Sequence, residues 1–147
     1  MIFTFALIAI VIGTLMPLQA GLNAELTRNL QHPFAGAFIS FLVGTIALAG
    51  ILLFTDGFSN VKRLSMVSPH LFLGGVLGAI FVTSSILLIP RMGATAMMGA
   101  FVTGQLLGSI IIDHFGFLGV PVSPINLTKV AGTVFLLAGL FLIMKKA

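Results

Sequence analysis

Residues 64–90, LSMVSPHLFLGGVLGAIFVTSSILLIP, contain no Lys, Arg, Asp or Glu, and only Arg91 separates them from residues 92–112, MGATAMMGAFVTGQLLGSIII, which contain none either. The hydrocarbon core of a bilayer is about 30 Å thick, so a spanning helix needs roughly 20 apolar residues. Both stretches meet that length. Working outward, the same pattern recurs at residues 1–24, 29–55 and 130–144. The last stretch is long enough if Lys129 snorkels from its first turn. The sequence predicts an all-α, polytopic membrane protein.

The composition excludes a water-exposed domain of useful size. Of the 147 residues, 59% are hydrophobic and 7% are charged, and the mean hydropathy is +1.23, whereas a soluble domain is about 25% charged. We therefore expect one integral membrane domain, residues 1–147, with the lipid bilayer as its partner. The chain has no cysteine, which excludes disulfides and thiolate metal sites. The net charge of +4 is scattered over the loops, so no nucleic-acid partner is expected.

Five membrane-spanning helices are predicted from prolines, glycines and charges at their ends. Pro17 can kink the first helix, which can also continue toward Asn29. Pro33 stands at a favoured first-turn position of the second, and a turn at Asp56-Gly57 follows it. Removal of the first segment would leave four spans, but its lack of a positive start favours a retained helix. The expected ranges are about 2–20, 34–54, 70–89, 93–113 and 127–144.

The orientation of five spans is weakly specified. Three basic residues collect on one side and four on the other, so the usual excess of Lys and Arg on the cytoplasmic side is missing. Insertion both ways round would permit an antiparallel dimer. The alternative is a single orientation fixed by other features. The two sets are Lys62, Arg63 and Lys129 on one side, and Arg28, Arg91, Lys145 and Lys146 on the other.

Four polar residues in the predicted spans are candidates for substrate binding: Gln19, Asn23, Ser40 and Gln105. Gln19 and Asn23 are four residues apart and share a helix face. A polar group in hydrocarbon must be paired or face a water-filled cavity. These side chains either line a polar cavity or hydrogen-bond across helices to hold the bundle together.

Three titratable residues near span ends are candidates for proton coupling or gating. Glu25 would couple protons if the first helix is long and tilted, and otherwise is a headgroup-level acid beside Arg28. Asp113 and His114 form a pair at a helix end, and histidine titrates near neutral pH. That pair either gates the protein or simply ends the helix at the interface.

Small residues at regular spacing predict close helix packing, because they let backbones approach each other in lipid. Gly104 and Gly108 continue a stripe from Ala96 and Ala100, while Gly132 and Gly139 share a face of the last helix. Packing within one bundle explains such stripes, but five short helices could hardly enclose a pathway. A dimer of ten helices could, so we assign these four glycines to dimer packing.

Sequence motifs for soluble chemistry are missing: there is no Walker loop, HExxH helix, G-x-S-x-G elbow or CxxC. His32, His70 and His114 lie on separate segments. We therefore expect no enzyme activity, no metal site and no cofactor.

Several runs resemble one family of membrane proteins. PLQAGLNA at 17–24 and SFLVGT at 40–45 are similar to the first two helices of the YdcZ-like branch of the drug/metabolite transporter superfamily. GQLLGS at 104–109, continuing to IDHFG at 112–116, is the most specific match, and PRMGA at 90–94 adds to it. The resemblance implies a five-span protein of the bacterial inner membrane, in some members encoded as tandem pairs or fused as ten spans, with largely undefined substrates.

A more distant likeness is to the small multidrug resistance transporters, four-span proteins that work as antiparallel dimers. Carried over, Gly132 and Gly139 would form the dimer contact. That family holds a glutamate in the middle of its first helix, whereas Glu25 lies near the far end here, and the chain has no Trp or Tyr for an aromatic cage. The chain is thus expected to be a secondary transporter of a small polar metabolite or organic cation, working by alternating access. A passive dual-topology channel and a non-transporting subunit that pairs with a paralogue are the alternatives.

Overall fold

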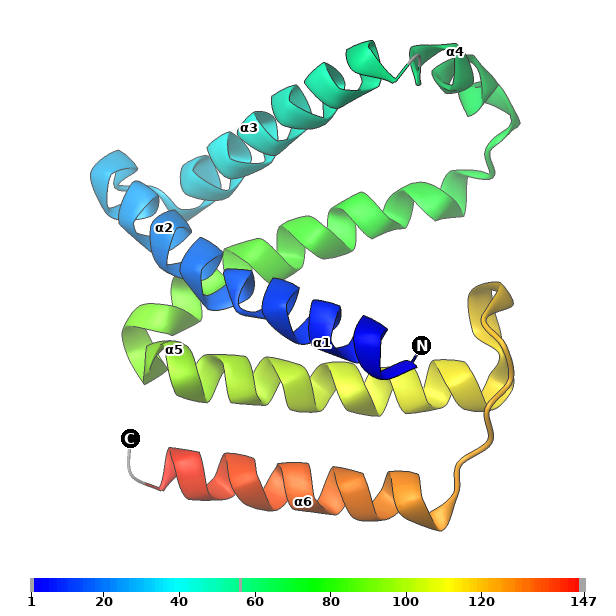
Figure 1. The fold of residues 1–147 in the computed structure, drawn as a ribbon. Coiled ribbons are helices and arrows are strands. Elements are labelled where there is room, and N and C mark those ends of the chain that lie inside the picture. Colours follow the sequence, from blue (N-terminus) through cyan, green and yellow to red (C-terminus); the bar gives the residue numbers. More distant parts are fainter. Residues whose placement is uncertain (1, 56, 146–147) are drawn as a thin grey trace. The chain divides into compact units, whose positions relative to one another are not determined.

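The computed structural model describes residues 2–55 and 57–145, and these residues form helices and connecting loops without a strand. Figure 1 shows the order of the elements. The residues divide into two compact units, 1–90 and 91–147. Asp56 of the predicted Asp56-Gly57 turn and Lys146 of the predicted basic end lie outside the described residues.

In the first unit, α1 (Ile2–Gly13) and α2 (Leu15–Leu30) form one span of 29 residues, interrupted at Thr14. Pro17 explains the interruption, because it has no N–H to donate to the carbonyl of Gly13. The helical stretch ends ten residues beyond the predicted end at Ala20. This is the continuation toward Asn29 that the sequence left open: Gly21 does not end the helix, which stops at Leu30, where Gln31 takes a left-handed φ of 54°.

Next in the chain, α3 (Pro33–Phe54) begins with Pro33 in its first turn, one residue before the predicted start. α2 packs against α3. Three short turns follow, α4 (Phe58–Val61), η1 (Lys62–Met66) and η2 (Pro69–Phe72).

The element α5 (Leu73–Phe115) joins, across a kink, the two helices that were expected to stop at Ile89 and restart at Gly93. Pro90 does not end the helix, because a proline removes only one backbone hydrogen bond. The break lies at Gly93, whose φ of 77° and ψ of 164° are not helical and suit glycine. The helical segments 73–92 and 94–115 thus flank a single irregular residue.

In the second unit, α6 (Leu127–Met144) occupies its predicted range, and a loop with the short turn η3 (Phe117–Gly119) precedes it. α6 runs antiparallel to residues 94–115. Lys129 at the start of α6 forms an ion pair with Asp113. Near the end of α6, Leu140 Cδ1 lies 3.0 Å from the position that a Cβ atom on Gly99 would occupy.

Very little apolar surface is buried in the single chain. Four helical stretches are long and apolar enough to cross a membrane, counting α1 with α2 and η2 with α5, and at most 11% of any such stretch is buried. Phe3 is 82% exposed and Phe135 is 78% exposed. A soluble monomer rarely exposes apolar patches of that extent. Lipid or further protein must cover these helices.

Candidate functional site

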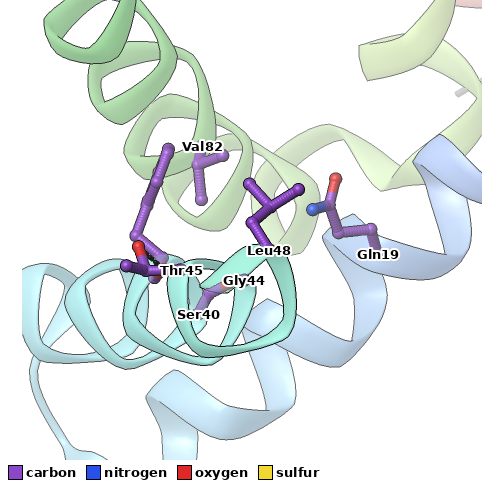
Figure 2. A pocket seen from close by; sticks show the side chains of 7 residues that line it. Gln19, Ser40, Gly44, Thr45, Leu48 and Val82 are labelled. Atoms are coloured by element: carbon purple, nitrogen blue, oxygen red, sulfur yellow. Dashed lines mark hydrogen bonds between the residues drawn. The ribbon is translucent and has the colours of Figure 1, made fainter. Parts of the chain in front are cut away.

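The first unit contains a pocket with a volume of about 250 Å³ between three helices (Figure 2). Gln19 comes from α2 and Val82 from α5, and the rest of the wall comes from α3. One turn of spacing along α3 places Ser40, Gly44 and Leu48 on the same side of that helix. Gly44 leaves open space there, because an added Cβ would meet nothing within 4 Å. The lining residues are Gln19, Ser40, Phe41, Gly44, Thr45, Leu48 and Val82.

Two of the four predicted substrate-binding residues, Gln19 and Ser40, are brought together in this pocket. The carboxamide of Gln19 offers two donors and an acceptor, and the hydroxyl of Ser40 offers both functions. The hydroxyl of Thr45 already donates to the carbonyl oxygen of Phe41 at 2.8 Å. The wall has no charged residue. The lining therefore offers neutral hydrogen-bonding groups and the aromatic ring of Phe41.

Asn23 does not line the pocket but lies one turn beyond Gln19 on the same face of α2. It is 6% exposed, and its Nδ2 has no hydrogen-bond partner among the described residues. Leaving a buried donor unpaired costs about 1–3 kcal/mol. The expected interhelical hydrogen bond from this Nδ2 is thus not formed in this arrangement.

Gln105 belongs to the second unit, where it is exposed, and it does not line the pocket. A second pocket in the first unit, of about 380 Å³, has the hydroxyls of Thr83 and Ser84 in an otherwise apolar wall. It contains no carboxamide, so the smaller pocket is the better candidate for a polar solute.

α2 and α3 approach each other closely where Gly36 faces Thr27. A Cβ on Gly36 would overlap the Thr27 hydroxyl oxygen and would lie 3.1 Å from Thr27 Cβ and 3.2 Å from its Cα. The Thr27 hydroxyl is itself buried without a partner in the described part of the chain. Gly36 therefore sets how closely the two helices approach beside the pocket.

The second unit holds a polar cluster, which we call the clasp, formed by Asp113, His114, Ser123, Ile125 and Lys129. The Lys129 ammonium donates to the carbonyl and hydroxyl oxygens of Ser123 at 2.7 and 3.0 Å, and lies 3.5 Å from Asp113 Oδ2. The Ser123 N–H donates to the Asp113 carbonyl oxygen at 2.8 Å. The Ile125 N–H donates to His114 Nδ1 at 3.2 Å. The clasp ties the loop before α6 to the end of α5.

The remaining predicted site residues lie apart from the pocket lining. Glu25 is exposed within α2, and its carboxylate lies 3.5 Å from the Arg28 guanidinium one turn further along that helix. An added Cβ would meet nothing within 4 Å at any of the four glycines assigned to dimer packing. Those glycine faces are therefore open in the single chain; the residues are Gly104, Gly108, Gly132 and Gly139.

The sequence identified Asp113 and His114 as candidate residues but did not identify the residues that they contact. The sequence predicts Lys129 as a snorkelling residue in the first turn of the last helix and as a charge at a span end. The opposite charge of Asp113 across a short loop was a signal for the ion pair, and Asn126 three residues before Lys129 was a signal for the helix cap that it forms. Nothing in the sequence pairs Thr27 with Gly36.

The sequence of the chain matches a family of inner membrane proteins. The family model described as "Putative inner membrane exporter, YdcZ" matches residues 4–142. The inner membrane protein YdcZ of Escherichia coli (strain K12) is 28% identical over 142 residues, which cover 96% of this chain and 93% of that protein. No solved structure matches. Because the family match covers nearly the whole chain and its helices are apolar enough to span a bilayer, this multi-pass protein of the bacterial inner membrane belongs to the YdcZ family.

Proposed function

We propose that the chain is the protomer of a secondary transporter that moves a small polar metabolite or organic cation across the inner membrane. The observation that carries the proposal is the pocket that joins Gln19 and Ser40 in the wall between α2, α3 and α5. The description of the family as an exporter supports it. Neutral hydrogen bonds would orient the solute, and the Phe41 ring would attract a cation through its π face.

The size of the pocket favours a site that is shared between protomers. Small-molecule sites usually enclose about 300–1,000 Å³, and this pocket of about 250 Å³ lies just below that range. A second copy would enlarge it and bring further polar side chains, with Asn23 and Gln105 as our candidates. Packing along Gly104, Gly108, Gly132 and Gly139 would form the dimer.

We infer five membrane segments, and the length of α5 supports this number. At 1.5 Å per residue, the 43 residues of α5 would make a helix about 65 Å long, twice the thickness of a bilayer core. The break at Gly93 divides α5 into pieces of about 30 Å. Five segments, with basic residues nearly balanced between the two sides, support dual topology and an antiparallel dimer of ten helices, or a heterodimer with a paralogue.

The clasp or Glu25 would supply proton coupling. His114 Nδ1 accepts a hydrogen bond from Ile125, and a protonated Nδ1 cannot accept one. Protonation of His114 would therefore release one tie of the loop before α6. Transport by alternating access would use such a change to open one side of the cavity. We propose no catalysis and no cofactor.

The test is solute flux in proteoliposomes that contain the purified protein. Ethidium is the cation probe, and a pool of isotope-labelled polar metabolites, read by mass spectrometry, covers neutral solutes. Transport predicts saturable flux that Gln19→Ala and Ser40→Ala each reduce at least tenfold. Thr45→Val is the matched control, because its hydroxyl is already bonded to Phe41. Equal flux in all three variants would contradict the assignment of this pocket.

The two rival functions give different results in the same vesicles. A passive channel predicts flux that does not saturate and does not respond to a proton gradient. A non-transporting subunit predicts no flux for any solute until a paralogue is added. Orientation is tested separately, in intact cells, by labelling Asn29→Cys and Asn60→Cys with a membrane-impermeant reagent, since the chain has no natural cysteine. Labelling of each site in about half of the molecules would support dual topology, and complete labelling of one site alone would contradict it.

A further inference from the structure

The segment between α3 and α5 is amphipathic with a period of three residues. Residues 58–67 read FSNVKRLSMV, and every third residue from the first is apolar. The two other registers contain Ser59, Lys62 and Ser65, and Asn60, Arg63 and Met66. The apolar register is Phe58, Val61, Leu64 and Val67.

The structure gives this segment the backbone that suits its period. α4 supplies one helical turn and η1 continues it as a 3-10 helix. Side chains three residues apart eclipse each other in a 3-10 helix. Phe58, Val61 and Leu64 therefore form one apolar stripe along these two turns, with Lys62 and Arg63 on the neighbouring faces, and Val67 follows the end of η1 in extended backbone.

The described chain covers the stripe only in part. All residues from 58 to 72 are exposed; Phe58 and Val61 are each 45% exposed and Leu64 is 54% exposed. The flanking helices α3 and α5 belong to stretches that are long and apolar enough to cross a membrane. A short connection between two spans stays close to the bilayer surface, where an apolar stripe meets acyl chains.

The charge of the segment identifies the lipid. Residues 58–72 include Lys62, Arg63 and His70 but no acidic residue. Basic residues on the polar faces of a helix that lies in the interface are attracted to anionic headgroups. We propose that residues 58–67 form an interfacial anchor that inserts its apolar stripe at the bilayer surface and binds anionic phospholipid through Lys62 and Arg63.

The absence of Trp and Tyr from the chain makes this proposal easy to test. The Phe58→Trp variant carries a single tryptophan on the apolar stripe, and Asn60→Trp carries one on a polar face as the matched control. In vesicles of phosphatidylcholine and phosphatidylglycerol, we expect lipid brominated at the 6,7 positions of its acyl chain to quench the fluorescence of Phe58→Trp strongly, and iodide to quench it weakly. The Asn60→Trp variant should show the reverse. Leu64→Trp repeats the test if Phe58→Trp does not fold, as judged by far-UV circular dichroism.

The anionic part of the proposal is tested in the Phe58→Trp background. Brominated phosphatidylglycerol diluted into phosphatidylcholine should quench more than brominated phosphatidylcholine diluted into phosphatidylglycerol. Each basic residue near an anionic surface contributes about a fivefold preference. Lys62→Gln with Arg63→Gln should thus lower the preference about thirtyfold, whereas Lys145→Gln should leave it unchanged.

Three results would overturn the proposal. Strong iodide quenching of both tryptophan variants alike would mean a loop in water. Protection of the Phe58→Trp fluorescence from both iodide and brominated lipid would mean that a second copy of the chain covers the stripe. An unchanged headgroup preference in the double glutamine variant would remove Lys62 and Arg63 from lipid recognition.

Discussion

The contact between Gly36 and Thr27 gives the sharpest prediction about stability. In Gly36→Ala the new methyl group overlaps the Thr27 hydroxyl. Rotation of that hydroxyl relieves only part of the strain, because Thr27 Cβ and Cα still lie 3.1 and 3.2 Å away. α2 and α3 must then separate by a few tenths of an ångström. Overpacking of this kind costs about 1–3 kcal/mol.

Gly44→Ala is the matched control for that variant. It lies on the same helix, two turns further along, where an added Cβ meets nothing within 4 Å. Both substitutions gain the same helix propensity, about 1 kcal/mol. The difference between the two variants therefore isolates the overpacking, and Gly36→Ala should be less stable than Gly44→Ala by about 1–3 kcal/mol.

The assay is reversible unfolding in mixed micelles of dodecyl maltoside and sodium dodecyl sulfate, followed by far-UV circular dichroism. Thr27→Ala removes the overlapping hydroxyl, so it should be non-additive with Gly36→Ala and restore part of the lost stability. Equal free energies of unfolding for Gly36→Ala and Gly44→Ala, within about 0.5 kcal/mol, would refute the close approach of the two helices.

Three further predictions concern other parts of the chain. The free energy of unfolding of Asn23→Leu should lie within about 1 kcal/mol of the wild-type value, because the Asn23 Nδ2 has no partner to lose among the described residues. The same variant should reduce solute flux. A loss of stability without a loss of flux would support interhelical hydrogen bonding by Asn23 instead. Lys129→Met should speed hydrogen exchange at the Ser123 and Ile125 amides about tenfold, because a loss of about 1.4 kcal/mol in the stability of the clasp has that effect. Mass spectrometry measures the exchange, and Lys145→Met is the control. Gly93→Ala should cost about 1–3 kcal/mol in the same unfolding assay because of its positive φ, while Gly104→Ala, which has open space, should not.

The helices were largely predictable because bilayer thickness imposes a length that charge-free stretches reveal. α6 occupies its predicted range, and α3 begins one residue early. Helix ends were less predictable near proline. Pro90 suggested a stop that the backbone makes at Gly93, since one lost hydrogen bond does not end a helix but a positive φ does.

The candidate site was predictable by residue type and not by contact. Polarity inside a span selects Gln19 and Ser40 without regard to their neighbours, and both line the pocket. The same rule selects Asn23 and Gln105, which do not line it. Helix crossing angles determine that Val82 and Leu48 line the pocket and that Thr27 approaches Gly36 closely. An apolar sequence gives almost no indication of these angles.

The single irregular residue within α5 has a consequence for biogenesis. In the five-segment arrangement, only a few residues connect the third span to the fourth. No soluble loop between these two spans is therefore available for separate translocation. The insertion machinery would have to insert both spans as one unit. The orientation of the third span would then fix the orientation of the fourth. An error in orientation could then be corrected only for the pair, and a reporter domain fused at Arg91 should block insertion instead of reporting topology.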